Sequence, residues 1–375
     1  MTRRIVLRAV LVTLVALAAT FLLDPYWNFQ LARFAACFAA VAGLTVLVGL
    51  TGQLSLGHAV LMAAGGYGYA FAAGPVTDAL GDSPAAPYAG LLAGLLGGLV
   101  ASGALGALLG AAAARLHGPY LAGLTLALVI ALPSAAVALP GLGGDQGIGV
   151  PFVPVPDALA TLMYVEHFHA VVAIVVAAAA VTPLAVLRAG RHGLRMRAVL
   201  GHETAARLSG VNPGLVKAGA FTASSLSAGL GGAVIVMATQ SVSPGAFGLT
   251  FSMLLVVGAV IGGLGSIGGA AVGAGLVVLL PWAVEAALDH LPAGLPPVLA
   301  QRLDGNLAVI LTGAIVIAVI AARPGGVAQL LTPRTARDTA ADTPSGTAPD
   351  TAPDTAPDQA PDTASRDATS HDTER

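Results

Sequence analysis

Charged residues are scarce in this sequence. Only 10% of its 375 residues are charged, whereas a soluble globular protein has about 25%. Nine of the 19 acidic residues lie in the last 38 positions, which leaves ten acidic and 13 basic residues over positions 1–331. So few charges cannot solvate the surface of a globule of that length, and this excludes a soluble protein. The net charge of −2 averages two unlike parts and gives no sign of nucleic-acid binding.

Cysteine and lysine each occur once. Cys37 has no second cysteine, which excludes disulfides and multi-cysteine metal sites. Lys217 is followed by Ala218 rather than by Ser or Thr, so the P-loop of nucleotide hydrolases is absent. The eight histidines form no H-E-x-x-H zinc pattern, and no G-x-S-x-G nucleophile turn occurs. We therefore expect no catalytic residue, no metal site and no cofactor bound by this chain.

Ionisable residues are nearly absent from the interiors of the apolar runs. Such groups mark the ion path in proton- or sodium-driven carriers. Here His58 is the exception, close to the start of a run, and Glu285 stands near the end of another. The energy for active transport would therefore have to come from another molecule.

Long apolar runs are what the sequence does contain. Each is close to the ~20 residues that a helix needs to cross a bilayer core. We predict an all-α, polytopic transmembrane helix bundle of about ten spans, in which the eighth and ninth are separated by a glycine-rich kink and form either two spans or one broken helix. The spans cover residues 5–23, 34–50, 57–73, 88–111, 119–139, 168–187, 218–240, 250–264, 267–288 and 306–322.

The basic residues predict the orientation of the chain. With ten spans and a cytoplasmic N-terminus, 15 of the 17 Lys and Arg residues fall on the cytoplasmic side, and only Arg33 and Arg302 fall outside. This agrees with the positive-inside rule. Both termini are therefore predicted to be cytoplasmic.

The composition changes abruptly at Thr332. From there on the chain is dominated by Asp, Thr, Ala, Pro and Ser, and Asp-Thr-Ala-Pro is repeated at 350–353 and 354–357. A segment with so few large apolar residues cannot bury a core. We predict a transmembrane domain over residues 1–331 and a disordered cytoplasmic tail over residues 332–375.

Residues 188–217 form a long basic segment between two spans. Leu194, Val199 or Leu200, and Leu208 can line one side of short amphipathic helices, with arginines on the other side. One interpretation is a loop that fixes the topology and contacts anionic lipid. The other is a docking helix that receives force from a cytoplasmic partner, and the residues alone favour neither.

Polar residues between the second and third spans are candidates for lining a solute pathway. Gln53, Ser55 and His58 follow a glycine, and irregular backbone at membrane depth persists only where protein or a water-filled path satisfies it. Tyr67 and Thr125 are further candidates. The alternative is that these groups close helix ends and pack between spans.

Three glycines in the ninth predicted span and just before it have small-xxx-small spacing. Gly265, Gly269 and Gly273 permit close helix approach. We assign them to helix packing, within the chain or against a second membrane subunit.

Six segments, taken in order, resemble the permease subunits of branched-chain amino acid ABC transporters. The resemblance covers about residues 30–330. The segments are Leu50-Thr-Gly-Gln-Leu-Ser-Leu-Gly-His58, Gly118-Pro-Tyr-Leu-Ala-Gly-Leu-Thr-Leu-Ala127, Gly143-Gly-Asp-Gln-Gly-Ile148, Ala205-Ala206 with Gly210-Val-Asn212, Gly262-Gly-Leu-Gly-Ser-Ile-Gly-Gly269, and Arg323-Pro-Gly325.

The resemblance implies one half of an importer in a bacterial inner membrane. It implies a second permease subunit, two cytoplasmic ATPase subunits that hold ATP and Mg, an extracytoplasmic substrate-binding protein, and a small-molecule substrate, with leucine, isoleucine or valine expected. The basic segment looks like the family's ATPase-coupling segment, although Thr204 stands where the family has Glu. The residues implied in coupling are Arg197, His202, Glu203, Thr204, Ala205, Ala206, Gly210 and Asn212.

Other functions are compatible with the same residues. Related permeases carry urea, short amides or other amino acids. From different classes, the chain could be an ATPase-independent channel or carrier, or a membrane scaffold that transports nothing.

Overall fold

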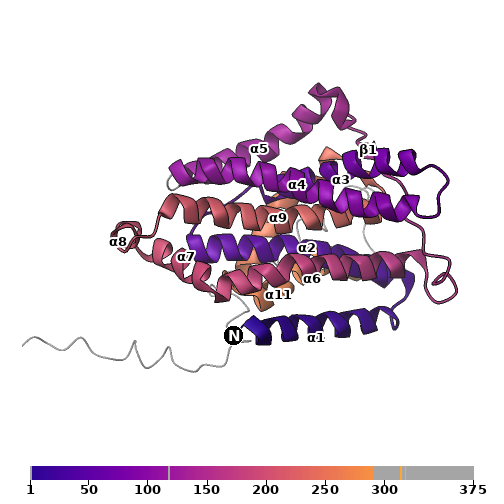
Figure 1. The fold of residues 1–375 in the computed structure, drawn as a ribbon, viewed down its shortest axis with the longest axis horizontal. Coiled ribbons are helices and arrows are strands. Elements are labelled where there is room, and N and C mark those ends of the chain that lie inside the picture. The colour runs from indigo at the N-terminus through magenta and orange to yellow at the C-terminus, as the bar shows by residue number, and fades with distance from the viewer. Residues whose placement is uncertain (1, 117–118, 290–312, 315–316, 318–375) are drawn as a thin grey trace, which may run out of the picture. The chain divides into compact units, whose positions relative to one another are not determined.

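The computed structural model describes residues 2–116, 119–289, 313, 314 and 317. Most of the tenth predicted span, the Arg323-Pro-Gly325 segment and the predicted tail over 332–375 lie outside these residues. The elements belong to the unit Met1–Thr332 (Figure 1). In order they are α1 (Thr2–Thr20), α2 (Pro25–Thr51), α3 (His58–Leu80), α4 (Ala86–Arg115), α5 (Pro119–Ala138), η1 (Pro140–Leu142), β1 (Ile148–Gly149), α6 (Val165–Ala189), α7 (Arg191–Gly201), α8 (Glu203–Leu208), α9 (Pro213–Thr239), β2 (Ser241–Val242), η2 (Pro244–Phe247), α10 (Leu249–Gly262) and α11 (Ile267–Asp289).

The long helices coincide with the predicted spans. Among the described residues, seven helical stretches are long and apolar enough to cross a membrane, and the stretch 267–283 of α11 is a shorter apolar helix. α1 is also a helix, but its three arginines keep it outside that group. The chain is therefore an all-α, multi-pass membrane protein.

Helices α2, α3 and α9 form the buried centre of the bundle, because glycines bring their backbones into contact. A Cβ at Gly65 of α3 would overlap the backbone of Gly229 in α9, and one at Gly232 of α9 would overlap the carbonyl group of Met62. Gly231 of α9 meets the carbonyl oxygen of Ala36 in α2 in the same way. Small residues drive such packing between membrane helices, where lipid gives no hydrophobic force.

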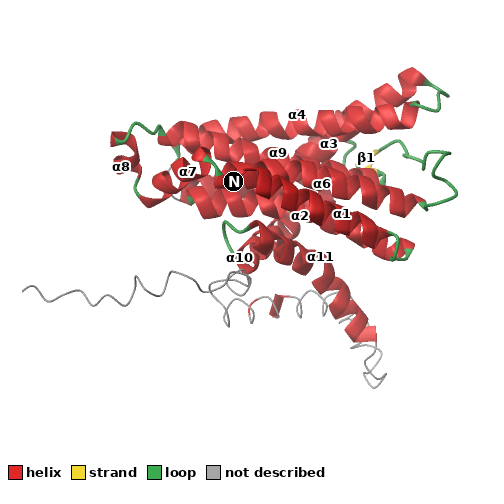
Figure 2. Cartoon of the chain, turned by 60° about the horizontal axis from the view of Figure 1, so that its bottom comes forward, coloured by secondary structure: helices red, strands yellow, loops and turns green. Residues whose placement is uncertain are grey.

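Helices α10 and α11 form a tight antiparallel hairpin. Gly258 and Gly262 of α10 lie against Gly273 and Gly269 of α11, and a Cβ added at Gly258, Gly262 or Gly273 would crowd or overlap the backbone of the other helix. Figure 2 shows the two helices as a pair on one side of the bundle. Gly265 lies in the turn between them with a φ of 78°. The glycine-rich kink is thus a reversal of the chain, and the option of one broken helix is wrong.

The turn of this hairpin is attached to α2. The N–H group of Gly265 donates to the carbonyl oxygen of Thr45 at 2.9 Å. Gly49 of α2 approaches the same turn so closely that a Cβ there would overlap the backbone of Gly265. The three glycines predicted to pack therefore all make backbone contacts within this chain.

The two ends of the bundle carry opposite charges. α7 and α8 lie at one end, and the connection that contains β1 lies at the other (Figure 1). The connections and helix ends beside α7 and α8 carry Arg115, Arg188, Arg191, Arg195, Arg197, Arg207 and Lys217, whereas those at the opposite end carry Asp24, Asp78, Asp82, Asp145, Asp157 and Glu166. The basic segment and the acidic loops therefore lie on opposite sides of the membrane.

Candidate functional site

The segment between α2 and α3 returns into the bundle as non-helical backbone. α2 ends at Thr51 and is capped by Gly52, which adopts a φ of 70°. Gly43, eight residues before that end, lies against Ser224 of α9. His58 at the start of α3 lies beside the same Ser224, with 3.4 Å between the His58 Nε2 and Ser224 Oγ atoms. Residues 52–57, named the break below, therefore run back by about 12 Å along the bundle before α3 begins.

Two neighbouring helices satisfy both backbone polar groups of Leu56 in the break. Thr125 Oγ1 on α5 accepts a hydrogen bond from the Leu56 N–H group at 3.0 Å. Ser252 Oγ on α10 donates to the Leu56 carbonyl oxygen at 2.6 Å and lies 3.4 Å from the Ala59 N–H group. Gly57 allows α5 to approach, because a Cβ there would overlap the Thr125 carbonyl oxygen. Such partners are what irregular backbone requires inside a membrane.

The predicted polar side chains in and next to the break are buried and keep unpartnered atoms. Gln53 is 6% exposed, and Ser55 and His58 have no exposed surface. Both amide atoms of Gln53, the Ser55 hydroxyl and the His58 Nδ1 atom have no hydrogen-bond partner among the described residues. A buried unpaired polar group costs about 1–3 kcal/mol of stability. Their presence in the interior therefore points to a role other than stabilising the fold.

The five predicted pathway residues do not all come together. Gln53, Ser55 and His58 lie in or directly after the break, and Thr125 reaches it through the hydrogen bond to Leu56. Tyr67 lies nine residues beyond His58, about 13 Å further along α3. Its ring stacks near Phe71, with 6.3 Å between the ring centroids.

Helix α7 packs on the bundle with a different face from the one predicted. The buried residues are Gly193, Met196 and Val199, and the leucines predicted to pack are exposed, Leu194 by 62%, Leu200 by 47% and Leu208 of α8 by 87%. Of the predicted apolar positions, only Val199 faces inward. The reason is Gly193, where a Cβ would overlap the backbone of Arg188 in α6. The absence of that Cβ turns this face of α7 toward α6 and the leucines toward the outside.

Helix α8 is a short turn that is attached to α9 by an ion pair. Its first residue, Glu203, accepts a hydrogen bond from Lys217 of α9, which is 7% exposed. The His202 Nδ1 atom caps the helix by accepting from the Ala205 N–H group at 3.4 Å. Ala206 is buried against the chain. Of the residues that the family resemblance implies in coupling, Glu203 and Ala206 therefore contact the rest of this chain.

The other predicted coupling residues lie on the outside of this end. Arg197, Thr204 and Ala205 are exposed. Gly210, two residues after the end of α8, has a φ of 78°, a conformation that favours glycine. Asn212 Oδ1 caps α9 by accepting from a backbone N–H group at 3.3 Å. A cavity of about 480 Å³ opens beside α8 and is lined by Ala114, Arg207 and residues 210–214.

Two contacts connect α7 and α8 to the break. Leu200 of α7 lies against Gly52, since a Cβ there would be 2.9 Å from the Leu200 Cδ1 atom. Lys217, which holds α8, is seven residues before Ser224 on α9, and residues with this spacing lie on one face of a helix. Ser224 in turn contacts His58. A displacement of α7 or α8 would therefore be transmitted to the break.

Sequence reasoning missed two residues of this site, Ser224 and Ser252. Both are fully buried and both contact residues in or next to the break. The available signal was a small hydroxyl residue inside an otherwise apolar predicted span. It was too weak to use alone, because serine also bonds to the backbone of its own helix, as Ser225 does with Phe221.

Comparison with known proteins gives one family. A family model described as a branched-chain amino acid transport system permease component matches residues 29–320. No curated protein matches the chain. No solved structure matches it either.

Proposed function

The chain belongs to the family of branched-chain amino acid transport permease components, and we propose that it forms half of the membrane path of an ATP-driven importer. Membership in this family makes it a subunit of a larger transporter. In the proposed assembly a second permease completes the path, two cytoplasmic ATPases supply the energy, and an extracytoplasmic binding protein delivers leucine, isoleucine or valine. The chain lies in the inner membrane with its basic end in the cytoplasm.

The observation that carries this proposal is the link between the basic segment and the break. α7 and α8 present exposed apolar and basic side chains at one end, while Leu200 and Lys217 connect the same helices to the break. The break itself holds buried polar atoms without partners. We propose that an ATPase binds α7 and α8, that its movement shifts the break, and that Gln53, Ser55 and His58 face the passing solute. Uncharged groups of this kind suit a zwitterionic or neutral solute.

The docking part of the proposal is tested with Leu208, the one leucine of α8, which is 87% exposed. We expect Leu208→Glu to release the ATPase subunit during co-purification, because it puts a charge into an apolar contact. ATP-driven uptake of radiolabelled leucine into vesicles should fall at least tenfold. Leu162→Glu is the matched control, since Leu162 is 68% exposed but lies in the connection between α5 and α6.

The outcomes separate the alternatives. If Leu208→Glu retains the ATPase and full uptake, α8 is not the docking site. If uptake by the unaltered protein proceeds without ATP, the chain is an independent channel or carrier. The same uptake assay with urea or a short amide in place of leucine decides which solute is carried. If the vesicles take up none of these solutes, the proposed transport function is wrong.

A further inference from the structure

A second cavity lies at the end of the bundle opposite α7 and α8. Its volume is about 460 Å³, and it opens between the first turns of α2 and α6, the end of α9 and the chain that follows β1. Small-molecule sites commonly have volumes of about 300–1,000 Å³. The cavity shares no residue with the break or with the basic segment, so the proposed transport cycle leaves it unexplained.

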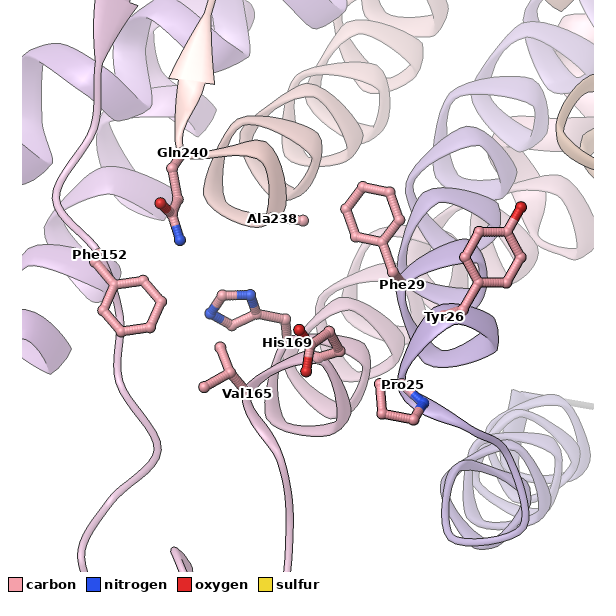
Figure 3. A pocket seen from close by; sticks show the side chains of 9 residues that line it. Pro25, Tyr26, Phe29, Phe152, Val165, His169, Ala238 and Gln240 are labelled. Atoms are coloured by element: carbon pink, nitrogen blue, oxygen red, sulfur yellow. The ribbon is translucent and has the colours of Figure 1, made fainter.

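Aromatic rings supply much of the wall. Figure 3 shows Tyr26 and Phe29 of α2 on one side and Phe152 on the other. The Tyr26 hydroxyl accepts a hydrogen bond from Gln30 Nε2 at 2.9 Å, so its ring is oriented by a neighbour on the same helix. The faces of such rings attract cations, by about 0.5–1 kcal/mol at exposed sites and more when water is excluded.

The polar groups of the wall are chiefly hydrogen-bond acceptors. Glu166 supplies a carboxylate and makes no ion pair with any described residue. The His169 Nε2 atom lies 3.0 Å from the Val153 carbonyl oxygen, which can only accept, so that nitrogen donates and the neutral ring keeps a lone pair on Nδ1. No Lys or Arg side chain lines the cavity.

Gln240 is held in the wall by an unusual backbone. It is the one residue other than glycine with a positive φ, 57°, in the described part of the chain. Its carbonyl oxygen accepts from the Val150 N–H group at 3.0 Å, directly beside the β1–β2 pair. Strained residues of this kind cluster at ligand-binding sites. Here the strain places the amide of Gln240 opposite the ring of Phe29 (Figure 3).

The surrounding charge favours a cation. The described connections and helix ends here include the carboxylates of Asp24, Asp78, Asp82, Asp145, Asp157 and Glu166, and Arg33 is the basic residue nearest to them in sequence, two turns into α2. A surface of one sign raises the local concentration of ions of the other sign. We propose that this cavity binds an organic ammonium group, held by the Glu166 carboxylate and by the rings of Tyr26, Phe29 and Phe152.

The ammonium group has two sources, the headgroup of phosphatidylethanolamine and a small solute in the outer medium. Binding can be followed in the full-length protein, because a chain of ring contacts connects its two tryptophans to the cavity residue Tyr26. Trp27 contacts Tyr26 edge to face with 5.7 Å between the ring centroids, and Trp282 contacts Trp27 in the same way at 4.8 Å. The probes are butylammonium chloride and 1-butanol, which has the same alkyl chain without the charge.

The test titrates both probes into the protein in nanodiscs of phosphatidylglycerol, which has no ammonium group. We expect a saturable change of tryptophan fluorescence with butylammonium and none with butanol. Glu166→Gln should raise the Kd about tenfold, which is the effect expected when a charge-assisted hydrogen bond to the ligand is lost. Asp157→Asn is the matched control, since it removes an exposed carboxylate from the same end without touching the cavity, and it should change the Kd less than twofold.

Each result decides the proposal. An equal response to butanol, or an unchanged Kd in Glu166→Gln, overturns it. If Glu166→Gln does not fold, Phe29→Leu takes its place with an expected threefold rise in Kd, and an unchanged Kd there also overturns the proposal. Adding phosphatidylethanolamine to the discs identifies the source, because only a lipid ligand competes with butylammonium. The assay contains no ATPase, so its outcome is independent of the proposed transport function.

Discussion

At the scale of single residues, some buried polar side chains have hydrogen-bond partners and others do not. Thr45 and Ser227 are fully buried, but each hydroxyl donates to a backbone carbonyl group, at 3.0 and 2.6 Å. In and next to the break, by contrast, Gln53, Ser55 and His58 keep atoms without partners among the described residues. Buried polar groups are almost always satisfied in folded proteins. The break therefore brings together three side chains whose interior polar atoms are available to a solute, and the unpartnered hydroxyls of Tyr67 and Tyr69 lie further along α3.

The ion pair between Lys217 and Glu203 gives a prediction at this scale. Replacing Lys217 by Met removes its ion pair with Glu203, which is only one-third exposed. We expect the free energy of unfolding to fall by about 1–2 kcal/mol. Glu203→Gln should cost less in this background than in the unaltered protein, because the interaction with Lys217 is already lost. Denaturant unfolding of the two single variants and the double variant measures this, and strictly additive losses would show that the pair contributes nothing.

Arg195→Met is the control for that experiment. Arg195 lies on the exposed side of α7 in the same segment, and we expect its replacement to change the free energy of unfolding by less than about 0.5 kcal/mol. A comparable loss in this variant would mean that basic charge in the segment, rather than the pair, stabilises the protein.

At the scale of elements, glycine positions decide which helices touch. In α3, Gly65 meets α9, whereas Gly74 has nothing within 4 Å of an added Cβ. We expect Gly65→Ala to destabilise the protein by about 1–3 kcal/mol, because the helices must separate. Gly74→Ala should stabilise it by up to about 1 kcal/mol, because alanine favours the helix. Thermal unfolding of both variants in the same detergent should give shifts of opposite sign, and a shared sign would mean that α3 and α9 are not packed this closely.

Most helices could be predicted from the sequence, because an uncharged apolar run of sufficient length has one stable form in lipid. Their contacts could not. Lipid and the protein interior are equally apolar, so a span such as α10 can be apolar on all sides. The order of its residues then does not show which face packs against other helices. The reversal at Gly265 is fixed by contacts with α2, more than 200 positions away, and the inward face of α7 depends on the close approach of Gly193 to Arg188 across the turn from α6.

The candidate site was predictable only in part for a similar reason. The polar residues in and next to the break are conspicuous in the sequence because they interrupt an apolar region. Ser252 and Ser224 are not conspicuous, and their contacts with Leu56 and His58 span more than 160 positions. The pairing of Lys217 with Glu203 was also missed, because the separation of 14 residues crosses two changes of direction in the chain.

At the scale of the whole molecule, the proposed orientation can be tested with the single cysteine. Cys37 is 3% exposed, so an impermeant maleimide should not label the unaltered protein. In a Cys37→Ala background, Ser83→Cys lies in the connection from α3 to α4 and Ser209→Cys follows α8; both positions are exposed. We expect intact spheroplasts to label only Ser83→Cys, and opened vesicles to label both. Labelling of Ser209→Cys in intact spheroplasts would reverse the orientation.

Helix α9 is anchored at both of its ends. The ion pair of Lys217 holds its first turns to α8, while the chain directly after it pairs through β2 with β1 in the connection that leads to α6. A helix of 27 residues is stiff over its length of about 40 Å. A load on the connection that contains β1 would therefore tilt a stiff helix whose other end holds α8. Under the proposed function, the arrival of a solute at one end and the movement of an ATPase at the other would act on this same helix.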